Sequence, residues 1–399
     1  FSFPSYLDEA IEAMHPMRLF LLLVSLAAST VGFIVPATQN RALVHSNRQI
    51  DHISTNHRLS TFEGKFSASR GSVLVLDAAS AAPSEKSTLI SPRVKVLGYF
   101  ALWFLLNAYY NIANKKTLNM VALPWIVSSA QLIIGSIYIC FVWLLKIRPA
   151  PKVNKESLMA VLPLAALHTT SHISAVIGLG AGAVGFFHIV KSLEPLFTAF
   201  LSAVLLKIYL PVPVALSLLP VVGGVALASL KELTFSWVTF GGAMGSNLAA
   251  ATRGILAKKQ MGKIELPNLD PGNLYGLTTI LAAIILSPAA LIVEGPKFRA
   301  VWSAALSAGH LPQNIIRGMV MSGLYFYLYN EVAFYCLGNI DATTHAVGNT
   351  IKRVVLLGVS VIVFGHQLTP LGLAGSGTAI GGVLLYSLLK DHYAKKAKK

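Results

Sequence analysis

The chain has 399 residues, of which 54% are hydrophobic and only 12% are charged, and its formal net charge at pH 7 is +16. Soluble domains usually carry about a quarter charged residues, so this composition excludes a soluble globular protein. The basic residues lie largely in short loops and at the ends of apolar segments. A nucleic-acid-binding protein would gather them on one soluble face. The sequence therefore predicts a membrane protein with a lipid bilayer as its surroundings and no nucleic-acid partner.

The first 91 residues are predicted to be targeting sequence. Residues 17–32 have a basic start, a short apolar run and small residues at the expected cleavage position, as in a signal peptide. Residues 33–91 are rich in Ser, Thr, Ala and Arg and poor in acids, which is typical of a transit peptide; a disordered tail is the alternative. Together they resemble the two-part presequence of plastids acquired by secondary endosymbiosis. Residues 1–16 are interpreted as an upstream extension, and residues 92–399 as the membrane domain.

From residue 96 onward, apolar segments recur whose length suits a hydrocarbon core about 30 Å thick. Ten are predicted, at residues 96–114, 123–145, 158–179, 183–206, 212–230, 234–256, 274–293, 315–337, 343–364 and 371–389. An even number places both ends of the domain on one side of the membrane. On that assumption fifteen Lys and Arg residues lie on the terminal side and six on the other, a bias that favours ten segments.

Two stretches of the domain resemble each other. Residues 188–225 contain a His, a Lys, a proline break and Val-Gly-Gly-Val, and residues 345–383 contain a His, a Lys, a proline break and Ile-Gly-Gly-Val. They lie five segments apart, which is an odd number, so the second enters the membrane from the opposite face. We therefore predict an all-α membrane protein with ten transmembrane helices in two inverted five-helix repeats, about residues 96–230 and 234–390. Chance similarity of Gly-rich helices is the alternative.

Three cations lie inside the predicted segments: Lys191 in the fourth, and Lys352 and Arg353 in the ninth. A cation at the bilayer centre costs at least ~2.5 kcal/mol, so it needs a partner or a water-filled cavity. Their equivalent places in the two repeats predict one central cavity, and three cations suit a phosphate, with its charge of about −1.5 to −2. The alternative is internal ion pairing, with Glu194 as the partner of Lys191 and Glu331 as the best partner of the other two.

Other polar residues in the segments are weaker candidates. His172 and Tyr329 are hydrogen-bonding groups for carboxylate or hydroxyl oxygens, and packing is their alternative role. Arg253 either reaches the cavity or extends to the membrane interface. Cys140 and Cys336 lie in apolar segments and are predicted to be small core residues without a disulfide. We find no Cys/His metal pattern, and we expect neither a metal nor a cofactor.

These residues and their surroundings resemble the plastidic phosphate translocators of the drug/metabolite transporter superfamily, and within them the triose-phosphate/phosphate translocator subgroup. The resemblance covers about residues 96–390. It is carried by residues 111–116, 188–195, 253–259, 292–296, 327–330, 344–354 and 362–365. It implies the ten-helix inverted-repeat fold. It also implies exchange of inorganic phosphate for phosphorylated C3 compounds, triose phosphate and 3-phosphoglycerate, across a plastid envelope membrane.

The resemblance also implies which residues bind substrate. The family's residues fall on Lys191, Lys352, Arg353, Tyr329, His172 and Arg253. One departure follows the helix-three histidine, because Ala175 and Val176 stand where the family usually has a hydroxyl residue and Asn. A substrate contact is therefore expected to be missing, with Ser171 or Ser174 as candidates to replace it.

Two rival functions remain open on the sequence. The first is transport of another phosphorylated metabolite, such as phosphoenolpyruvate or a hexose or pentose phosphate, or of a nucleotide sugar. The second is a membrane enzyme, but we find no Ser/His/Asp set, so we expect no enzymatic activity. The oligomeric state stays open.

Overall fold

The computed structural model describes residues 92–230, 232–233, 235–260, 269–339 and 342–396, which belong to one unit running from Ile90 to Lys399. The predicted signal peptide, transit peptide and upstream extension lie outside the described residues. Every secondary-structure element within the described ranges is a helix.

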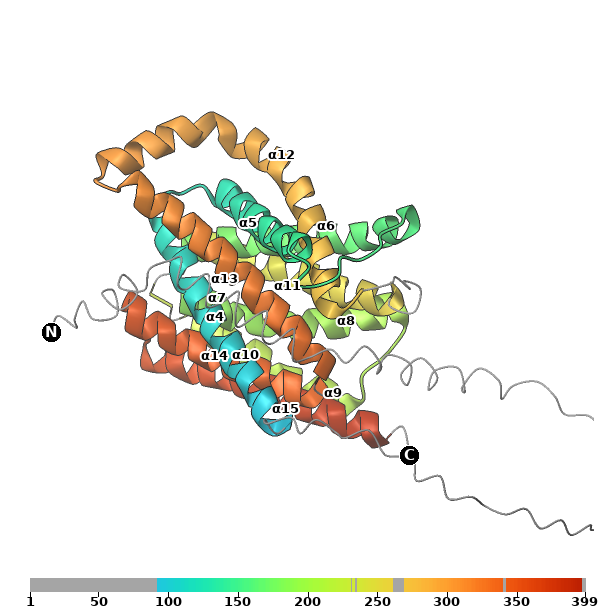
Figure 1. Cartoon of the computed structure of the whole chain (residues 1–399). Helices are drawn as coiled ribbons and strands as arrows, with labels where there is room; N and C mark the ends of the chain where they lie inside the picture. The colour runs from blue at the N-terminus through green and yellow to red at the C-terminus, as the bar shows by residue number, and fades with distance from the viewer. Residues whose placement is uncertain (1–91, 231, 234, 261–268, 340–341, 397–399) are drawn as a thin grey trace, which may run out of the picture. The chain divides into compact units, whose positions relative to one another are not determined.

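The helices follow the predicted segments closely (Figure 1). They are α4 (Pro92–Met120), α5 (Pro124–Leu144), α6 (Lys155–Ala181), α7 (Val184–Val190), η1 (Lys191–Leu193), α8 (Glu194–Leu206), α9 (Val212–Leu216), α10 (Leu218–Leu230), α11 (Trp237–Gln260), α12 (Pro271–Ser307), α13 (Pro312–Asn339), α14 (Ala342–Phe364) and α15 (Pro370–Lys396). The fourth predicted segment is the run α7–η1–α8, and the fifth is α9–α10. Each of the other eight coincides with one helix.

Six of these helical segments are long and apolar enough to cross a membrane: α5, α6, α7–α8, α9–α10, α12 and α15. Within the described residues, the other four segments, α4, α11, α13 and α14, do not meet this criterion of length and hydropathy. These four helices carry polar side chains that are turned toward the protein, among them Asn111, Asn247, Glu331 and Arg353. Their lower hydropathy is thus explained by groups that do not face lipid.

The packing of the helices pairs the first five segments with the second five. The main pairs include α4 with α13, which lie side by side in Figure 1, and α6 with α11. Equivalent segments also pair with each other: α5 with α12, α7 with α14, and α10 with α15. If each segment is exchanged for the one five places away, α4–α13 becomes α11–α6 and the other pairs map onto themselves. The list of main packing pairs is therefore unchanged by the exchange.

Glycines make the α10–α15 crossing possible. A Cβ on Gly224 would lie 2.6 Å from the carbonyl oxygen of Gly375, and a Cβ on Gly375 would lie 2.8 Å from that of Gly224. Small residues let helix backbones approach closely, as is common in membranes. In both Gly-Gly pairs of the repeat the second glycine packs, Gly224 in one and Gly382 in the other. The first, Gly223 or Gly381, has open space around it.

A carboxylate from α12 caps the start of α5. The residue before α5, Leu123, offers no side-chain cap, and Pro124 occupies the first turn. Glu294 Oε2 instead accepts a hydrogen bond from the backbone N–H of Ile126 at 3.0 Å, and Glu294 is buried. A negative group at a helix N-terminus satisfies a free donor and opposes the helix dipole. This explains why an acid is accommodated within α12.

The two cysteines differ in their surroundings. Both are free, as the sequence predicts, and Cys336 is buried. Cys140 is exposed, so its prediction as a core residue was wrong. It lines an apolar groove of about 520 Å³ between α5 and α12, beside Ile137 and Ile284. The sequence alone cannot separate an apolar residue facing lipid from one facing the core, because both environments are apolar.

Candidate functional site

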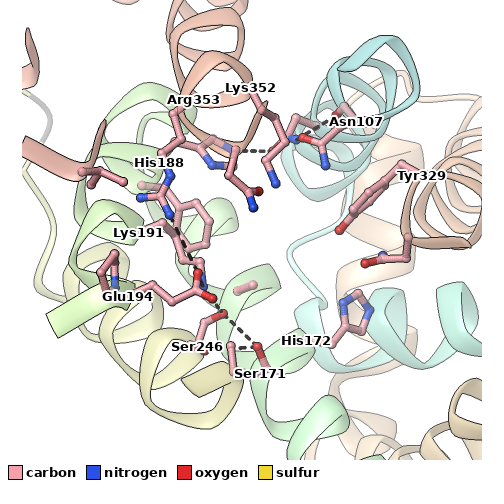
Figure 2. A pocket seen from close by; sticks show the side chains of 18 of the residues that line it. Asn107, Ser171, His172, His188, Lys191, Glu194, Ser246, Tyr329, Lys352 and Arg353 are labelled. Carbon is pink, nitrogen blue, oxygen red and sulfur yellow. Dashed lines mark hydrogen bonds and ion pairs between the residues drawn. The ribbon is translucent and has the colours of Figure 1, made fainter. Parts of the chain in front are cut away.

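One cavity of about 520 Å³ gathers Lys191, Glu194, Lys352 and Arg353 (Figure 2). Its lining comes from α4, α6, α7, η1, α8, α11, α13, α14 and α15. All of the residues predicted from the sequence as substrate-binding line it: Lys191, Lys352, Arg353, Tyr329, His172 and Arg253. The structure thus brings together groups up to 181 positions apart in the chain, from His172 to Arg353.

One carboxylate is shared by two of the cations. Glu194 Oε2 lies 3.5 Å from Lys191 Nζ and 3.8 Å from Arg353 Nη2. The alternative that Glu194 pairs with Lys191 is therefore confirmed. The same carboxylate also serves Arg353, which the sequence analysis did not foresee because the two residues belong to different helices.

A break in the fourth segment creates this arrangement. Pro195 has no N–H, so it cannot make the α-helical hydrogen bond to the carbonyl of Lys191. The N–H of Glu194 bonds to that carbonyl instead, which gives the 3₁₀ turn η1 over Lys191–Leu193. The turn places Lys191 and Glu194 next to each other on the cavity wall, as Figure 2 shows.

Lys352 has a different neighbour. Its ammonium lies 4.6 Å from the centre of the Trp103 ring, a cation–π contact with a residue that is 2% exposed. Among the described residues no carboxylate lies within 4 Å of Lys352. We call the three cations Lys191, Lys352 and Arg353, together with Glu194, the cluster. With three positive charges and one negative charge, the cluster has a net charge of +2.

Neutral hydrogen-bonding groups hold the cluster in place. Lys191 Nζ donates to Ser246 Oγ at 3.2 Å, and the hydroxyls of Ser246 and Ser171 lie 3.1 Å apart (Figure 2). On the other side of the cluster, His188 Nε2 and Asn111 Oδ1 are 2.9 Å apart. These contacts connect α6, η1 and α11, and α4 with α7.

A fourth cation lies farther along α11. Arg253 Nη1 is 2.9 Å from His168 Nδ1, and both residues line the cavity. Arg253 therefore reaches the cavity rather than the membrane interface. It follows Ser246 by seven residues, which is about 10 Å along a helix axis. Besides the cluster, the lining thus includes Arg253 and, on α15, Lys390, whose ammonium lies 5.4 Å from the centre of the Tyr386 ring.

His172 and Tyr329 face the cluster from the opposite side of the cavity (Figure 2). The His172 ring packs on Phe326 with centroids 4.0 Å apart, and Tyr329 packs on Tyr110 with centroids 5.3 Å apart. His172 Nε2 is buried and has no hydrogen-bond partner within the described part of the chain. Packing thus fixes the ring while one polar atom stays available.

The expectation that Glu331 is the best alternative partner for Lys352 and Arg353 was wrong. Glu331 Oε1 accepts a hydrogen bond from Arg148 Nη2 at 2.5 Å, and the two side chains are 4% and 3% exposed. Glu331 follows Tyr329 by two residues, so it is rotated by roughly 200° around α13 and faces away from the cavity.

Only one of the two departures from the family pattern alters the cavity. Ala175 lines it, whereas Val176 is fully buried and packs with Leu118 and Ile315. Of the two candidate replacements, Ser171 lines the cavity. Ser174 instead packs against α11, where its carbonyl oxygen lies 2.6 Å from a Cβ built on Gly242.

Several lining residues were missed by the sequence analysis: Asn107, Asn111, His168, Ser246, Asn330 and Asn349. A signal for some of them is present in the spacing. On α6 the lining residues are His168, Ser171, His172, Ala175 and Leu179, three or four positions apart along one helical face. No group of three His, Cys, Asp or Glu side chains within the described ranges is placed to hold a metal ion.

The chain is similar to known proteins over most of its membrane domain. Residues 94–387 match the model of the Triose-phosphate Transporter family. The chain is 37% identical over 310 residues to phosphoenolpyruvate/phosphate translocator 1, chloroplastic, of Oryza sativa subsp. japonica, covering 77% of this chain and 75% of that protein. It is 38% identical over 316 residues to the triose phosphate/phosphate translocator, non-green plastid, of Brassica oleracea var. botrytis, covering 78% of each.

A third relative is similar over a longer stretch. The xylulose 5-phosphate/phosphate translocator, chloroplastic, of Arabidopsis thaliana is 36% identical over 364 residues, which cover 88% of this chain and 86% of that protein. All three relatives are named translocators, and none is named an enzyme. The chain therefore belongs to the Triose-phosphate Transporter family and is a membrane transporter, not an enzyme.

Proposed function

We propose that this protein is an antiporter that exchanges inorganic phosphate for phosphorylated C3 compounds, triose phosphate and 3-phosphoglycerate. The observation that carries the proposal is the uncompensated positive charge of the cavity. Three cations and one carboxylate, which contacts two of them, leave a net charge of +2. A phosphate with about −1.5 to −2 charges offsets this excess, and Arg353 offers a planar fork for two of its oxygens.

The positions of the cluster and of Arg253 suggest how a C3 phosphate lies in the cavity. Its phosphate binds Lys191, Lys352 and Arg353. Its carbon skeleton extends toward the residues on the opposite wall and along α11: Tyr329, His172 and Arg253. A hydrogen-bonding atom such as His172 Nε2, buried without a partner in the described chain, supports this orientation, because a ligand oxygen would satisfy it.

We further propose ten transmembrane helices in two inverted repeats, about residues 96–230 and 234–390. Two findings support the repeats. Exchanging segments five places apart leaves the main packing pairs unchanged. In both Gly-Gly pairs the second glycine packs and the first does not. Transport would then proceed by rocking the two halves around a site between them.

Contacts at one end of the cavity would break during this rocking. The N–H of Gly185 donates to Ser360 Oγ at 2.9 Å, which joins the start of α7 to the end of α14. Glu232 and His366, whose Oε2 and Nε2 lie 3.5 Å apart, join the segments that follow α10 and α14. Each contact links the first half to the second, so this end is closed while the contacts persist.

The excess charge also explains why exchange would be obligatory. An empty cavity with a net +2 cluster is costly to enclose in a low-dielectric surrounding. A bound phosphate offsets most of that charge, so the loaded carrier changes conformation more easily than the empty one. Glu194 lowers the cost of the empty state without removing it.

The proposed location is a plastid envelope membrane. The relatives are named chloroplastic, and the two-part pattern of residues 17–91 suits a plastid of secondary origin. Immunogold labelling or a fluorescent fusion of the full chain in its own cell would test this, since signal at any other membrane contradicts it.

A second candidate is exchange of phosphate for another phosphorylated metabolite, with a nucleotide sugar as the more distant alternative. The observation in its favour is that relatives named for phosphoenolpyruvate, xylulose 5-phosphate and glucose 6-phosphate are as similar as the one named for triose phosphate, at 36–38% identity. The missing hydroxyl at Ala175 points the same way, because the cavity wall is more apolar there.

Exchange in liposomes tests both candidates. Purified protein is reconstituted, and uptake of labelled phosphate is measured against internal phosphate, dihydroxyacetone phosphate, 3-phosphoglycerate, phosphoenolpyruvate, xylulose 5-phosphate and glucose 6-phosphate. We expect fast uptake only with phosphate, dihydroxyacetone phosphate or 3-phosphoglycerate inside, and almost none into empty liposomes. Preference for phosphoenolpyruvate or a sugar phosphate would favour the second candidate. Uptake into empty liposomes would contradict obligatory exchange.

A further inference from the structure

His168 occupies a special place on the cavity wall. It lies one helical turn before His172 on α6, and it is 5% exposed. Tyr275 meets it edge-on at 5.7 Å and Phe326 lies parallel to it at 6.0 Å, both measured between ring centroids. These aromatic neighbours fix the plane of the imidazole, so its two nitrogens have defined directions.

The contact with Arg253 fixes the proton on this ring. A guanidinium only donates hydrogen bonds, so His168 Nδ1, at 2.9 Å from Arg253 Nη1, is the acceptor. The proton of the neutral imidazole is then on Nε2, which is buried without a partner among the residues that the structure describes. His168 therefore acts on Arg253 as a neutral acceptor.

A neutral partner adds no counter-charge to Arg253. No carboxylate lies within 4 Å of its guanidinium in the described chain, in contrast to Arg148, which is paired with Glu331. An acid beside Arg253 would orient it equally well but would neutralise it. His168 orients the guanidinium and keeps its charge available to a ligand.

Resting on the proposed function, we infer that His168 is a positioning residue. It holds Arg253 as the second cationic pole of the cavity and so favours phosphorylated substrates that carry a second anionic group. Inorganic phosphate has no such group and is bound by the cluster alone. The effect of His168 should therefore fall on one class of substrate and spare the other.

The test compares three variants of the full chain in the liposome assay. His168→Asn keeps an acceptor near the position of Nδ1, because the side-chain oxygen of Asn lies at the same distance along the side chain. His168→Gln places its oxygen farther out, and His168→Leu removes the acceptor. Thr170→Val is the matched control, since Thr170 is exposed on the same turn and bonds only within α6.

We expect His168→Leu and His168→Gln to raise the KM for 3-phosphoglycerate about tenfold, the effect of one charge-assisted hydrogen bond, while the KM for phosphate changes less than about twofold. His168→Asn and Thr170→Val should stay within about twofold of the unaltered protein for both substrates. In an Arg253→Gln background, His168→Leu should add nothing further, because its effect runs through Arg253.

Equal changes of both KM values, or an unchanged ratio in all three variants, would overturn the inference. If His168→Leu does not fold, the contrast between His168→Asn and His168→Gln decides. Failure of the proposed function looks different, because the unaltered protein would then not exchange phosphate for 3-phosphoglycerate or triose phosphate. A normal exchange rate with unchanged selectivity in the variants rejects only the role of His168.

Discussion

Two buried ionic groups of the same domain are built on opposite principles. Arg148 and Glu331 form a pair at 2.5 Å in which one charge balances one charge, and both side chains are almost completely buried. In the cavity, Glu194 faces Lys191 and Arg353 at longer distances of 3.5 and 3.8 Å and remains 37% exposed.

The difference separates a structural ion pair from a proposed binding site. Burial of a balanced pair offers nothing to a ligand, because each charge already has its partner. The cluster keeps a surplus of positive charge, and its carboxylate is accessible. In an apolar domain the net charge of a group of buried side chains is thus more informative than the residue types in it. A group with a surplus of one charge is a candidate site for a solute of the opposite charge.

The largest effect should come from removing the surplus. Lys352→Gln and Arg353→Gln each take away one cation of the proposed phosphate site, and we expect phosphate exchange in liposomes to fall below detection. Folding should persist, because loss of a repelling charge does not destabilise the empty protein. Lys297→Gln, an exposed residue of α12, is the charge-matched control. Robust exchange by both cavity variants would reject the site.

Breaking the balanced pair should instead affect stability. Glu331→Gln leaves Arg148 buried without its counter-charge, at a cost of about 3–5 kcal/mol. We expect a clear fall in Tm in detergent, with the KM for phosphate unchanged in the folded fraction. Replacing both residues, as Arg148→Met with Glu331→Met, should recover much of the Tm because no charge stays unpaired. A changed KM would show that the pair is coupled to the cavity.

A variant that increases the positive charge of the cluster tests the same comparison in the opposite direction. In Glu194→Gln the cluster charge rises from +2 to +3, and the carboxylate no longer competes with phosphate for Lys191 and Arg353. We expect the KM for phosphate to fall about three- to tenfold and the maximal rate to fall as well, because release becomes slower. A larger phosphate-induced rise in Tm should accompany this. A weaker affinity would mean that Glu194 supports the loaded state.

The last effect concerns Lys352, the cation of the cluster that has no carboxylate within 4 Å in the described chain. Trp103→Leu removes the ring beneath Lys352. A desolvated cation–π contact is worth up to about 2 kcal/mol, so we expect the KM for phosphate to rise about three- to tenfold. Trp103→Phe retains an aromatic face and should lie between the variant and the unaltered protein. Equal KM values for the Leu and Phe variants would show that only the volume of Trp103 matters.

The sequence was most informative where a charged residue lies within an apolar segment. Lys191, Lys352 and Arg353 stand out because a cation in such a run is costly, and all three line the cavity. Neutral residues such as His168 and Ser246 give no comparable signal, because they are also common in helix packing. Their role depends on which helix they face, and that is set by contacts between distant segments.

The angular position of a residue around its helix explains why the prediction for Glu331 was wrong. Glu331 was matched to the cavity cations although it lies roughly 200° around the helix from Tyr329. The same rule separates Ala175 from Val176, which differ by about 100° and face the cavity and the core respectively. For the fold, each of the ten predicted segments overlaps a helical segment, although α12 continues to Ser307, well past the predicted end at residue 293. The break at η1 depended on the single residue Pro195.

The apolar groove between α5 and α12 makes the protein convenient to label. The chain has only two cysteines, of which Cys336 is buried and Cys140 is exposed among Ile137 and Ile284. A membrane-permeant maleimide should thus attach a single probe at the bilayer-facing surface, while a bulky water-soluble reagent should attach none. Without any engineered mutation, a fluorophore at Cys140 would report on movement of α5 against α12 while transport proceeds.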